Sequence, residues 1–459
     1  MTRLKEINPG TEYLSLAERA VEKARQAGAN EAEAYLEIGR TFEVTIRNGE
    51  IELLKQAQSK GLGLRVIYDQ RLGFGHTNDL SEKSLDEVAK KSVALAKHAA
   101  RDEFLGFPDP VGVGSPKKSE QMDLIDPELG KISTDRKIAM AREMERAALS
   151  FDPRVKLVEG ATVADGDKWV VIANSKGFGG SFRSTGTHLS CSVVAEEQGQ
   201  KQVNYWYSHK RHLREHEPVE EIGRKAAHRA VQMLNARKIP SGKYPVVFDS
   251  LSASSLISAL AGGVNGESVY RNMSFLTDKL NEKIGPDFFT LIDDGMRPRG
   301  NASRPFDAEG ISSIRTPIVE RGVLKSFLYD SYTGRKVGKP STGNANRNYA
   351  STPHISPTNL YVRAGQFDPE AVIRSVQEGF YVTGMIGFGV DLVSGQFSRG
   401  ASGVWIERGE LAYPVQEVTI AGTLSEMMAN IEMIGNDLLF LDSISSPTLK
   451  ISEMTISGQ

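Results

Sequence analysis

Long stretches of alternating polar and apolar residues dominate the first half of the chain, and they limit the folds that it can adopt. The stretch from residue 31 to 79 alternates in this way and is interrupted by turn-forming residues. Its Asn48-Gly49 pair is a strong signal for a type I′ hairpin turn, because both central positions of that turn need a positive φ. A second alternating stretch runs from 155 to 211. Each stretch therefore predicts an antiparallel meander of strands.

Amphipathic helices flank both predicted meanders, because apolar residues recur at helical spacing before and after each alternating stretch. The order helix, meander, helix thus occurs twice. We expect two related α+β units at 1–106 and 119–235, although they share no clear residue-level identity. Together they form a predicted N-terminal α+β domain, residues 1–235. The predicted helices span residues 11–27, 81–100, 133–150 and about 219–236.

The second half of the chain is predicted to be mainly antiparallel β structure. A Pro-Ser-Gly loop at 240–242 separates it from the first half. Strand-like segments joined by polar hairpins follow, with two short helices near 368–377 and 424–434. We therefore expect an α+β fold that ends in a largely antiparallel β domain, residues 236–459.

Composition excludes several classes of protein. The chain has 459 residues, of which 56 are basic and 58 acidic, so its net charge is −2 and argues against direct nucleic-acid binding. The single cysteine, Cys191, excludes an intrachain disulfide and fits a reducing compartment. No apolar run reaches the roughly 20 residues of a membrane span, and the start of the chain does not look like a signal peptide. We expect a cytoplasmic protein that does not bind membranes.

Three of the eight histidines crowd into one short segment. His209, His212 and His216 have the spacing i, i+3 and i+7, which puts them on one face if the segment is helical. Three imidazoles on one face could hold zinc. A lysine and two arginines are interleaved with them and would oppose a metal ion. We therefore favour a solvated basic connector over a zinc site.

The serines of segment 248–268 raise the question of a nucleophile. A catalytic serine needs a base and an orienting acid within hydrogen-bond reach. Asp249 and His354 are available, but nothing in the sequence brings them together, and the segment has no G-x-S-x-G elbow. Helix capping and close packing of small residues explain these serines better.

A long polar loop at 341–358 is the best candidate for a binding segment. It is rich in turn-forming residues and precedes a predicted strand. Binding residues concentrate on loops of this kind, although a plain connection would look similar. The candidate binding residues in the loop are Arg347, Asn348, Tyr349 and His354.

The chain resembles the TldD/PmbA family, whose TldD-type and TldE (PmbA)-type members are paralogues. The resemblance covers most of the chain, and its segments occur in the order typical of the family. The segments that carry it are "RNGEIELLKQAQSKGLGLRVI", "TLIDDG", "FDAEGISSIRTPIVERGVLKSFLYDSYTGRKVG", "STGN", "TNLYV" and "MIGNDL".

This resemblance implies a metallopeptidase helix, HExxxH, directly after the strand that matches "YPVVF". In TldD-type members its two histidines bind the metal, its glutamate is the general base, and a later cysteine is the third ligand. Laid on this motif, Ser258 and Gly263 replace the histidines and Ala259 replaces the glutamate. No histidine lies between His228 and His354, and no cysteine follows "MIGNDL". Since zinc needs three or more protein donors, we expect no metal and no cofactor.

The resemblance therefore implies a TldE (PmbA)-type subunit that is inactive alone. Its expected partner is a TldD-type metallopeptidase, and its expected substrate is a peptide or unfolded segment held near the 341–358 loop. Without the partner we expect a homodimer. Two alternatives stay open: an autonomous protein-binding modulator linked to DNA gyrase, and a metal-independent serine hydrolase. A neighbouring gene that encodes HExxxH would favour the role as a subunit of a metallopeptidase. Labelling by a fluorophosphonate would favour the serine hydrolase.

Overall fold

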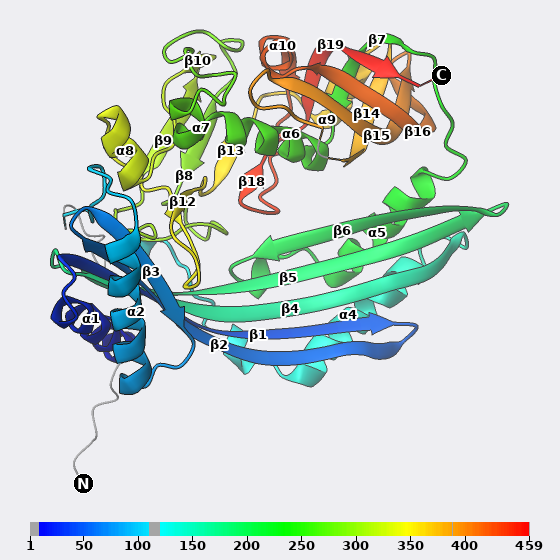
Figure 1. Ribbon diagram of the computed structural model, residues 1–459. Helices are drawn as coiled ribbons and strands as arrows, with labels where there is room; N and C mark the ends of the chain where they lie inside the picture. Colours follow the sequence, from blue (N-terminus) through cyan, green and yellow to red (C-terminus); the bar gives the residue numbers. More distant parts are fainter. Residues whose placement is uncertain (1–8, 110–119, 388, 459) are drawn as a thin grey trace.

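A six-stranded antiparallel sheet forms the N-terminal half of the protein (Figure 1). The computed structural model describes residues 9–109, 120–387 and 389–458. The strand order β3-β2-β1-β4-β5-β6 joins two three-stranded meanders through the pairing of β1 with β4. The strands are β1 (Glu31–Arg47), β2 (Glu50–Tyr68), β3 (Arg71–Thr77), β4 (Val155–Asn174), β5 (Gly179–Glu197) and β6 (Gln200–Lys210).

The turn between β1 and β2 follows the prediction from its Asn-Gly pair. Asn48 has a φ of 54° and Gly49 a φ of 76°, so both turn residues lie in the left-handed region. The flanking residues Arg47 and Glu50 pair across the hairpin. The two-residue hairpin is therefore confirmed.

Four helices cover one face of this sheet: α1 (Pro9–Gln26), α2 (Glu82–His98), α4 (Thr134–Leu149) and α5 (Val219–Gln232). Alternation along β1 explains the arrangement. Its buried even-numbered residues pack under α1 and α2 at one end, as Leu36 does, and under α4 and α5 at the other, as Val44 does. The odd-numbered residues of β1 point to the opposite face, because successive side chains of a strand alternate. The helix–meander–helix order is thus present twice.

The C-terminal half consists of two further sheets and short helices. Strands in the order β16-β15-β14-β7-β19 form one sheet with β17 at its edge, and β16 also pairs with β19, which closes the five strands into a barrel. The strands are β7 (Gly242–Phe248), β14 (Glu378–Ile386), β15 (Gln396–Glu407), β16 (Glu410–Thr423), β17 (Ile431–Ile434) and β19 (Leu449–Ser457).

The second sheet has the strand order β10-β9-β8-β13-β18, and β11 and β12 form a separate pair. Only β7 with β14 and β13 with β18 pair in parallel among the strands that the structure describes, so the predicted, largely antiparallel α+β fold is confirmed. These strands are β8 (Leu291–Asp294), β9 (Arg315–Glu320), β10 (Val323–Leu324), β11 (Ala345–Asn346), β12 (His354–Ile355), β13 (Leu360–Val362) and β18 (Ile444–Ser445).

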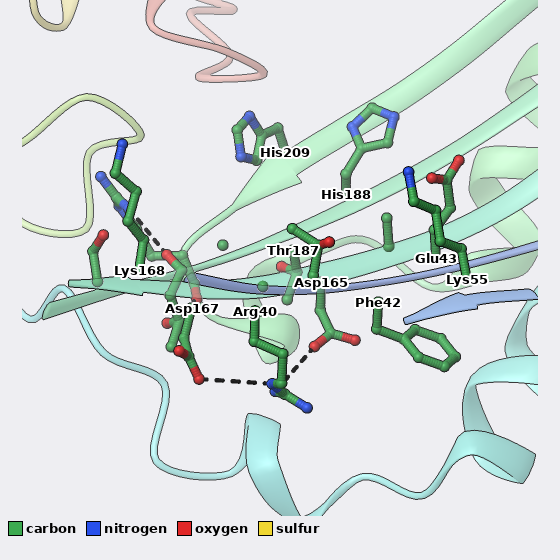
Figure 2. Close-up of a pocket in the computed structure, with 17 residues that line it drawn as sticks. Arg40, Phe42, Glu43, Lys55, Asp165, Asp167, Lys168, Thr187, His188 and His209 are labelled. Atoms are coloured by element: carbon green, nitrogen blue, oxygen red, sulfur yellow. Dashed lines mark hydrogen bonds and ion pairs between the residues drawn. The ribbon is translucent and has the colours of Figure 1, made fainter. Parts of the chain in front are cut away.

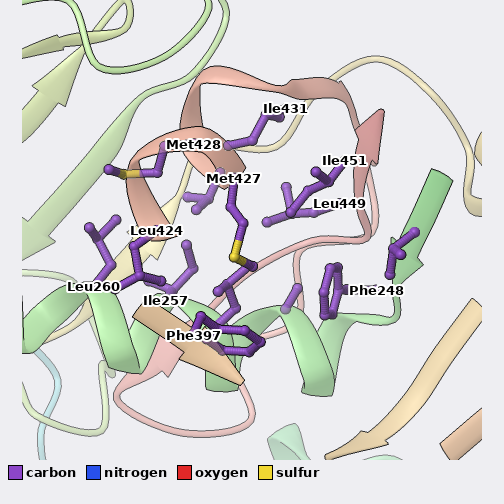
Figure 3. Packing of buried hydrophobic residues seen from close by; sticks show 14 of the residues in the cluster. Phe248, Ile257, Leu260, Phe397, Leu424, Met427, Met428, Ile431, Leu449 and Ile451 are labelled. Carbon is purple, nitrogen blue, oxygen red and sulfur yellow. The ribbon is translucent and has the colours of Figure 1, made fainter. Parts of the chain in front are cut away.

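The helices of this half are short, and the longest supplies part of its core. Ile257 and Leu260 extend from helix α6 into a cluster with Phe248, Phe397 and Met427 (Figure 3). None of the helices in the described ranges combines the length and hydropathy of a membrane span. The helices are α6 (Ser250–Gly263), α7 (Gly266–Tyr270), α8 (Ser331–Val337), α9 (Pro369–Arg374) and α10 (Leu424–Ala429).

The division of the chain near residue 235 stays a prediction, and limited proteolysis tests it. Residues 236–241 are irregular, and Lys238 is exposed. We expect trypsin to cut first at Lys238 and to leave two fragments that separate on a denaturing gel but elute together from a sizing column. Early cuts inside "TPIVERGVLKSFLYD" would contradict the proposed division. A second proposed cut region, 107–118, lies mostly outside the described residues.

Candidate functional site

Helix α6 lies on the side of the C-terminal half that faces the large sheet (Figure 1). Asp249 caps its N-terminus by accepting a hydrogen bond of 2.7 Å from the backbone N–H of Ser252. The other carboxylate oxygen of Asp249 forms an ion pair of 2.8 Å with Arg229 of α5. This pair ties the start of α6 to the N-terminal half of the molecule.

The three residues predicted to occupy the positions of the metallopeptidase motif lie in very different surroundings. Ser258 is exposed, Ala259 is half-buried and Gly263 is buried. A Cβ atom at Gly263 would lie 2.8 Å from the ring of Phe275, closer than real Cβ contacts come. A histidine at this position would therefore have to displace the Phe275 ring.

The donor set of this helix does not fit a zinc ion, because serine, alanine and glycine offer no imidazole or carboxylate. Among the residues that the structure describes, no group of three or more His, Cys, Asp or Glu side chains is arranged to hold a metal ion. Packing also closes the end of the helix, where a Cβ at Gly262 would lie 2.7 Å from Leu392.

Two serines of α6, Ser254 and Ser255, bond to backbone or to an arginine rather than to a histidine. Ser254 Oγ donates to the carbonyl of Ser250 at 2.6 Å and accepts from the N–H of Ser446 at 2.9 Å. Ser255 Oγ accepts from Arg399 at 2.8 Å. His354 lies on β12, paired with β11, while Asp249 is bound to Arg229. The arrangement supplies no base for a serine nucleophile among these partners.

The three clustered histidines do not form one helical face. His209 lies on β6, whereas His212 and His216 flank a short 3-10 turn, Leu213–Glu215. His212 Nε2 lies 3.0 Å from the carbonyl of Asp123. His216 is held on both sides, with Nε2 2.7 Å from the Thr187 hydroxyl and Nδ1 2.8 Å from the Ser208 hydroxyl. His209 Nδ1 lies 3.9 Å from Asp442 Oδ1. The three imidazoles thus face different partners, so the zinc alternative has no support.

The polar loop 341–358 docks on the large sheet through a buried charge network. Arg347 is buried and forms an ion pair with Glu33 of β1. Arg65 of β2 binds the same Glu33 oxygen at 2.9 Å and reaches Glu309 of the C-terminal half at 3.3 Å. Two carboxylates and two guanidinium groups therefore balance in the interior, as buried charges require.

Burial and the neighbouring carboxylates shift the pKa values of the two arginines in opposite directions. Desolvation lowers the pKa of Arg347, although Glu33 works against it. For Arg65, burial would also lower the pKa, but Glu33 and Glu309 outweigh it and raise the value. The Arg347 guanidinium additionally stacks on the ring of Tyr35, 4.5 Å from its centroid. Because the guanidinium group of arginine is not deprotonated in proteins, both side chains carry a charge.

Two glycines of β2 make room for the same loop. A Cβ at Gly61 would lie 2.3 Å from the ring of Tyr349, and one at Gly63 would lie 2.2 Å from its carbonyl oxygen. The backbone N–H of Tyr349 donates to Glu37 of β1 at 3.0 Å. Arg347 and Tyr349 thus fasten the loop, whereas Asn348 and His354 are exposed. The role of these four residues in binding stays a prediction.

A groove crosses the sheet face opposite the helices and was not predicted from the sequence (Figure 2). Its floor is a row of small residues on three neighbouring strands, where Thr41 pairs with Gly166 and Gly166 with Gly186. The groove has a volume of about 500 Å³. The sequence did contain a signal for this groove. On β2, β4 and β5, many positions that alternate with the core residues are Gly, Ser, Thr or Ala.

A cross-strand row of side chains forms one wall of this groove. The register places Lys55, Glu43, Ala164, His188 and His209 side by side on five successive strands. The two imidazole rings meet edge to face with centroids 6.2 Å apart. Burial, and then the neighbouring imidazole, lower the pKa of His188. This histidine is therefore biased toward its neutral form.

Cations occupy the opposite wall and one end of the groove. Lys168 forms an ion pair with Glu37. Arg211 donates to backbone carbonyls, at 3.0 Å for Thr185 and 3.1 Å for Gly300. Because no carboxylate offsets its burial, the pKa of Arg211 falls to about 10. Its charge is thus not neutralised locally.

The helix-side face below the groove carries a separate set of charges. Arg40 lies between Asp165, at 3.6 Å, and Asp167, at 3.8 Å, and Figure 2 shows these three side chains pointing away from the two histidines. Lys137 of α4 also binds Asp165, and Arg183 binds Asp167 at 3.0 Å. These ion pairs lie on the helix side of the sheet, so the side chains of the opposite face line the groove.

Comparison with known proteins identifies one family along the chain. Profiles of three successive domains match it: PmbA/TldA metallopeptidase domain 1 over residues 32–96, the central domain over 127–234 and the C-terminal domain over 241–458. The three matches cover more than half of the chain and leave only short segments between them.

Individual relatives match over almost their whole length. Metalloprotease PmbA of Escherichia coli O157:H7 is 32% identical, over 97% of this chain and 96% of its own. The PmbA homologue of Haemophilus influenzae is 33% identical, over 96% of this chain and 94% of its own. The TldD homologue of the same organism is 26% identical, over 93% and 92%.

Solved structures share the fold. A proposed modulator of DNA gyrase from Bacteroides thetaiotaomicron superposes with a TM-score of 0.89 at 30% identity, covering 98% of this chain and 99% of its own. TldE from Thermococcus kodakarensis gives a TM-score of 0.88 at 22% identity, over 96% of this chain and 100% of its own. At that identity the second likeness concerns the fold alone.

Removing one member of the buried charge network should destabilise the protein strongly. Arg347→Met leaves Glu33 with less compensation in the interior, and such losses cost about 3–5 kcal/mol. The exposed Arg101, paired with Asp69, is the control, and Arg101→Met should cost less than about 1 kcal/mol. Urea unfolding measures both. The double variant Glu33→Gln, Arg347→Met should recover part of the loss, and equal effects of the two single variants would contradict the network's role.

The buried His216 should make the protein sensitive to mild acid. Burial, and then Lys210 and the nearby imidazoles, lower its pKa to about 3. The folded state keeps it neutral while the unfolded chain protonates it near pH 6.5, so stability is full above that pH and falls as the pH drops toward 3. Between pH 7 and 5 the free energy of unfolding should fall by at most about 2 kcal/mol. His216→Gln should remove it, and His98→Gln, at an exposed site, should not.

Proposed function

Because the chain belongs to the PmbA/TldD family of metallopeptidase-related proteins, we propose that it is the non-catalytic, TldE (PmbA)-type subunit of a two-protein zinc peptidase. One observation carries this proposal. The helix that matches the metallopeptidase motif has Ser258, Ala259 and Gly263 at the motif positions, and Phe275 packs where a second histidine would need to go. A chain without donors can take part in peptide hydrolysis only beside a partner that supplies them.

The comparisons support the TldE (PmbA) branch over the TldD branch. Within Haemophilus influenzae, the PmbA homologue is 33% identical to this chain and the TldD homologue is 26% identical. The PmbA relatives carry the name metalloprotease, but a name does not supply ligands. The residues at 258, 259 and 263 of this chain's own helix support the assignment.

In the proposed complex this chain binds and orients the substrate, and the TldD-type partner supplies zinc and its general base. The 341–358 loop offers Asn348 and His354 as exposed contacts for an extended peptide, while Arg347 and Tyr349 hold the loop in place. When a peptide binds in an extended conformation, its main-chain hydrogen bonds give an affinity that is largely independent of its sequence. The substrate is therefore a peptide or unfolded segment rather than a folded protein.

We further propose that the chain forms a homodimer when its partner is absent, because paralogues that pair usually share one interface. A cytoplasmic location fits its single buried cysteine, Cys191. A second candidate function, modulation of DNA gyrase through a protein contact, comes from the similar Bacteroides thetaiotaomicron protein. The net charge of −2 favours a protein contact over direct DNA binding in that case.

Purified alone, the chain should contain no stoichiometric zinc, cleave no peptide and sediment as a dimer at micromolar concentration. Adding a TldD-type protein should convert the homodimer into a heterodimer with one zinc per pair. Sedimentation and elemental analysis measure both changes. About one zinc per isolated chain, removed by a chelator together with peptidase activity, would overturn the proposal.

The same reconstituted pair tests the loop. Asn348→Ala with His354→Ala should slow peptide turnover severalfold and leave the unfolding midpoint unchanged, because both side chains are exposed. The matched control is Asn78→Ala, an exposed asparagine outside the loop. Equal turnover by the loop variant and the wild type would remove the loop from the proposal.

A further inference from the structure

We propose that two copies of this chain associate through the outer edge of strand β2, residues 51–61, as an antiparallel strand pair. The inference names the surface of the homodimer proposed above and therefore rests on that proposal. Two observations carry it: a long strand edge without a neighbouring strand, and a pattern of charges along that edge that is complementary to itself.

The edge is free over most of the length of β2. Strand β1 pairs with β2 from Glu50 to Ile67, whereas β3 pairs with its other side only from Leu62 onward. No strand in the described ranges pairs with the outer side of residues 50–61. The backbone N–H and C=O groups that point outward there are therefore open to a strand of another chain.

The side chains of this segment are uncovered as well. Every residue from 50 to 60 except Ala57 is exposed. Leu53 and Leu54 keep 40% and 51% of their surface exposed. Natural proteins usually shorten, bend or cover such an edge, because it is a template for pairing with a second strand. A free edge of this length with exposed leucines therefore points to a partner strand.

The opposite edge of the sheet, on β6, is tied to the C-terminal half of the same chain. Gln202 Nε2 donates to the side chain of Gln416 at 2.7 Å. Lys210 donates to the carbonyl of Phe440 at 2.8 Å. The edge of β6 is therefore less available to a second chain than the edge of β2.

The charges along β2 favour a second copy as the occupant. In an antiparallel pair centred on Gln56, Glu52 of each copy lies opposite Lys60 of the other copy, which gives two ion pairs. Opposite charges that face each other across two strands stabilise the pair. Lys55 lies opposite the uncharged Ala57, so no like charges meet.

Neighbouring registers are less favourable. A pair centred on Lys55 would bring Glu50 opposite Lys60, but it would also place the two Lys55 side chains against each other. A pair centred on Ala57 would form no ion pair. The charges thus select Gln56 as the centre, and the six-stranded sheets of the two copies would then continue one another.

The contacts of Glu52 and Lys60 within one copy do not prevent this pairing. Glu52 forms an exposed ion pair of 3.1 Å with Arg47. Hydrogen bonds from Ser81 lower the pKa of Asp79, and the charge of Lys60 contributes the smaller part. Exposed contacts of this kind are weak, so both side chains remain available to a second copy.

Cysteine cross-linking reads the register directly. Opposite residues of an antiparallel pair have Cα atoms about 4.5–5.5 Å apart, within the range of a disulfide, whereas residues 54 of the two copies would lie about 13 Å apart along the strands. We expect oxidation of the full chain with Gln56→Cys to form a covalent dimer about tenfold faster than with Leu54→Cys or Gln58→Cys. A non-reducing gel measures the rates, and the native Cys191 is buried in all three variants.

Charge reversal tests whether the occupant is a second copy. Glu52→Lys and Lys60→Glu each place like charges opposite one another twice, so each should weaken self-association about tenfold in sedimentation. An equal mixture of the two variants has opposite charges at both positions and should associate as tightly as the wild type. Lys156→Glu, at an exposed lysine outside β2, should have no effect.

Two results would overturn this inference and leave the proposed subunit role standing. One is equal cross-linking at 54, 56 and 58 in a chain that sediments as a dimer, and the other is a mixture of charge variants that associates no more tightly than either variant alone. A wild-type chain that sediments as a monomer and shows no preference for cross-linking at 56 would overturn both this inference and the proposed homodimer.

Discussion

The pairing of Glu33 with Arg347 holds the two halves of the molecule in one arrangement. The two residues are 314 positions apart in the chain, and neither side chain has exposed surface. Arg65 and Glu309 extend the pair into a balanced group of four charges, half from the large sheet and half from the C-terminal half. A buried charge without its counterpart is costly, so the halves cannot slide or separate without exposing or orphaning these groups.

The position of this charge network determines how the 341–358 loop lies on the sheet. Once Arg347 is fixed, Tyr349 lies on the sheet above Gly61 and Gly63, where any larger residue would collide with it. The C-terminal half meets the sheet here and again at the β6 edge, where Lys210 donates to the carbonyl of Phe440 and Arg211 to that of Gly300. The rest of the face that the helices leave free, with its row of Thr41, Gly166 and Gly186, remains as a groove. The loop covers the sheet at Gly61 and Gly63, and the row of small residues beside it leaves the groove open.

Helix α6, the proposed counterpart of the metallopeptidase helix, is held mainly by its cap and its core contacts. Asp249 still caps the helix, and Ile257 and Leu260 still pack in the core. At the end of the helix, Phe275 and Leu392 occupy the space beside Gly263 and Gly262 that a ligand side chain would need. The packing that stabilises this half of the protein is therefore also what excludes the larger residues. Serine, alanine and glycine at these positions offer no imidazole or carboxylate, so the proposed role in binding fits this helix better than metal chemistry does.

The local pattern of the sequence determined the strands, helices and hairpins of this protein, because each depends on residues that are neighbours in the chain. Alternation predicted both meanders, and Asn48-Gly49 predicted its turn. The prediction that residues 258, 259 and 263 stand at the motif positions also came from the sequence. Only the tertiary structure decided that Arg347, expected at a binding cavity, is buried against Glu33, and that glycines on separate strands line up as one groove. Both depend on pairing between distant segments, and no local pattern reveals which charge meets which or how the strands are set in register.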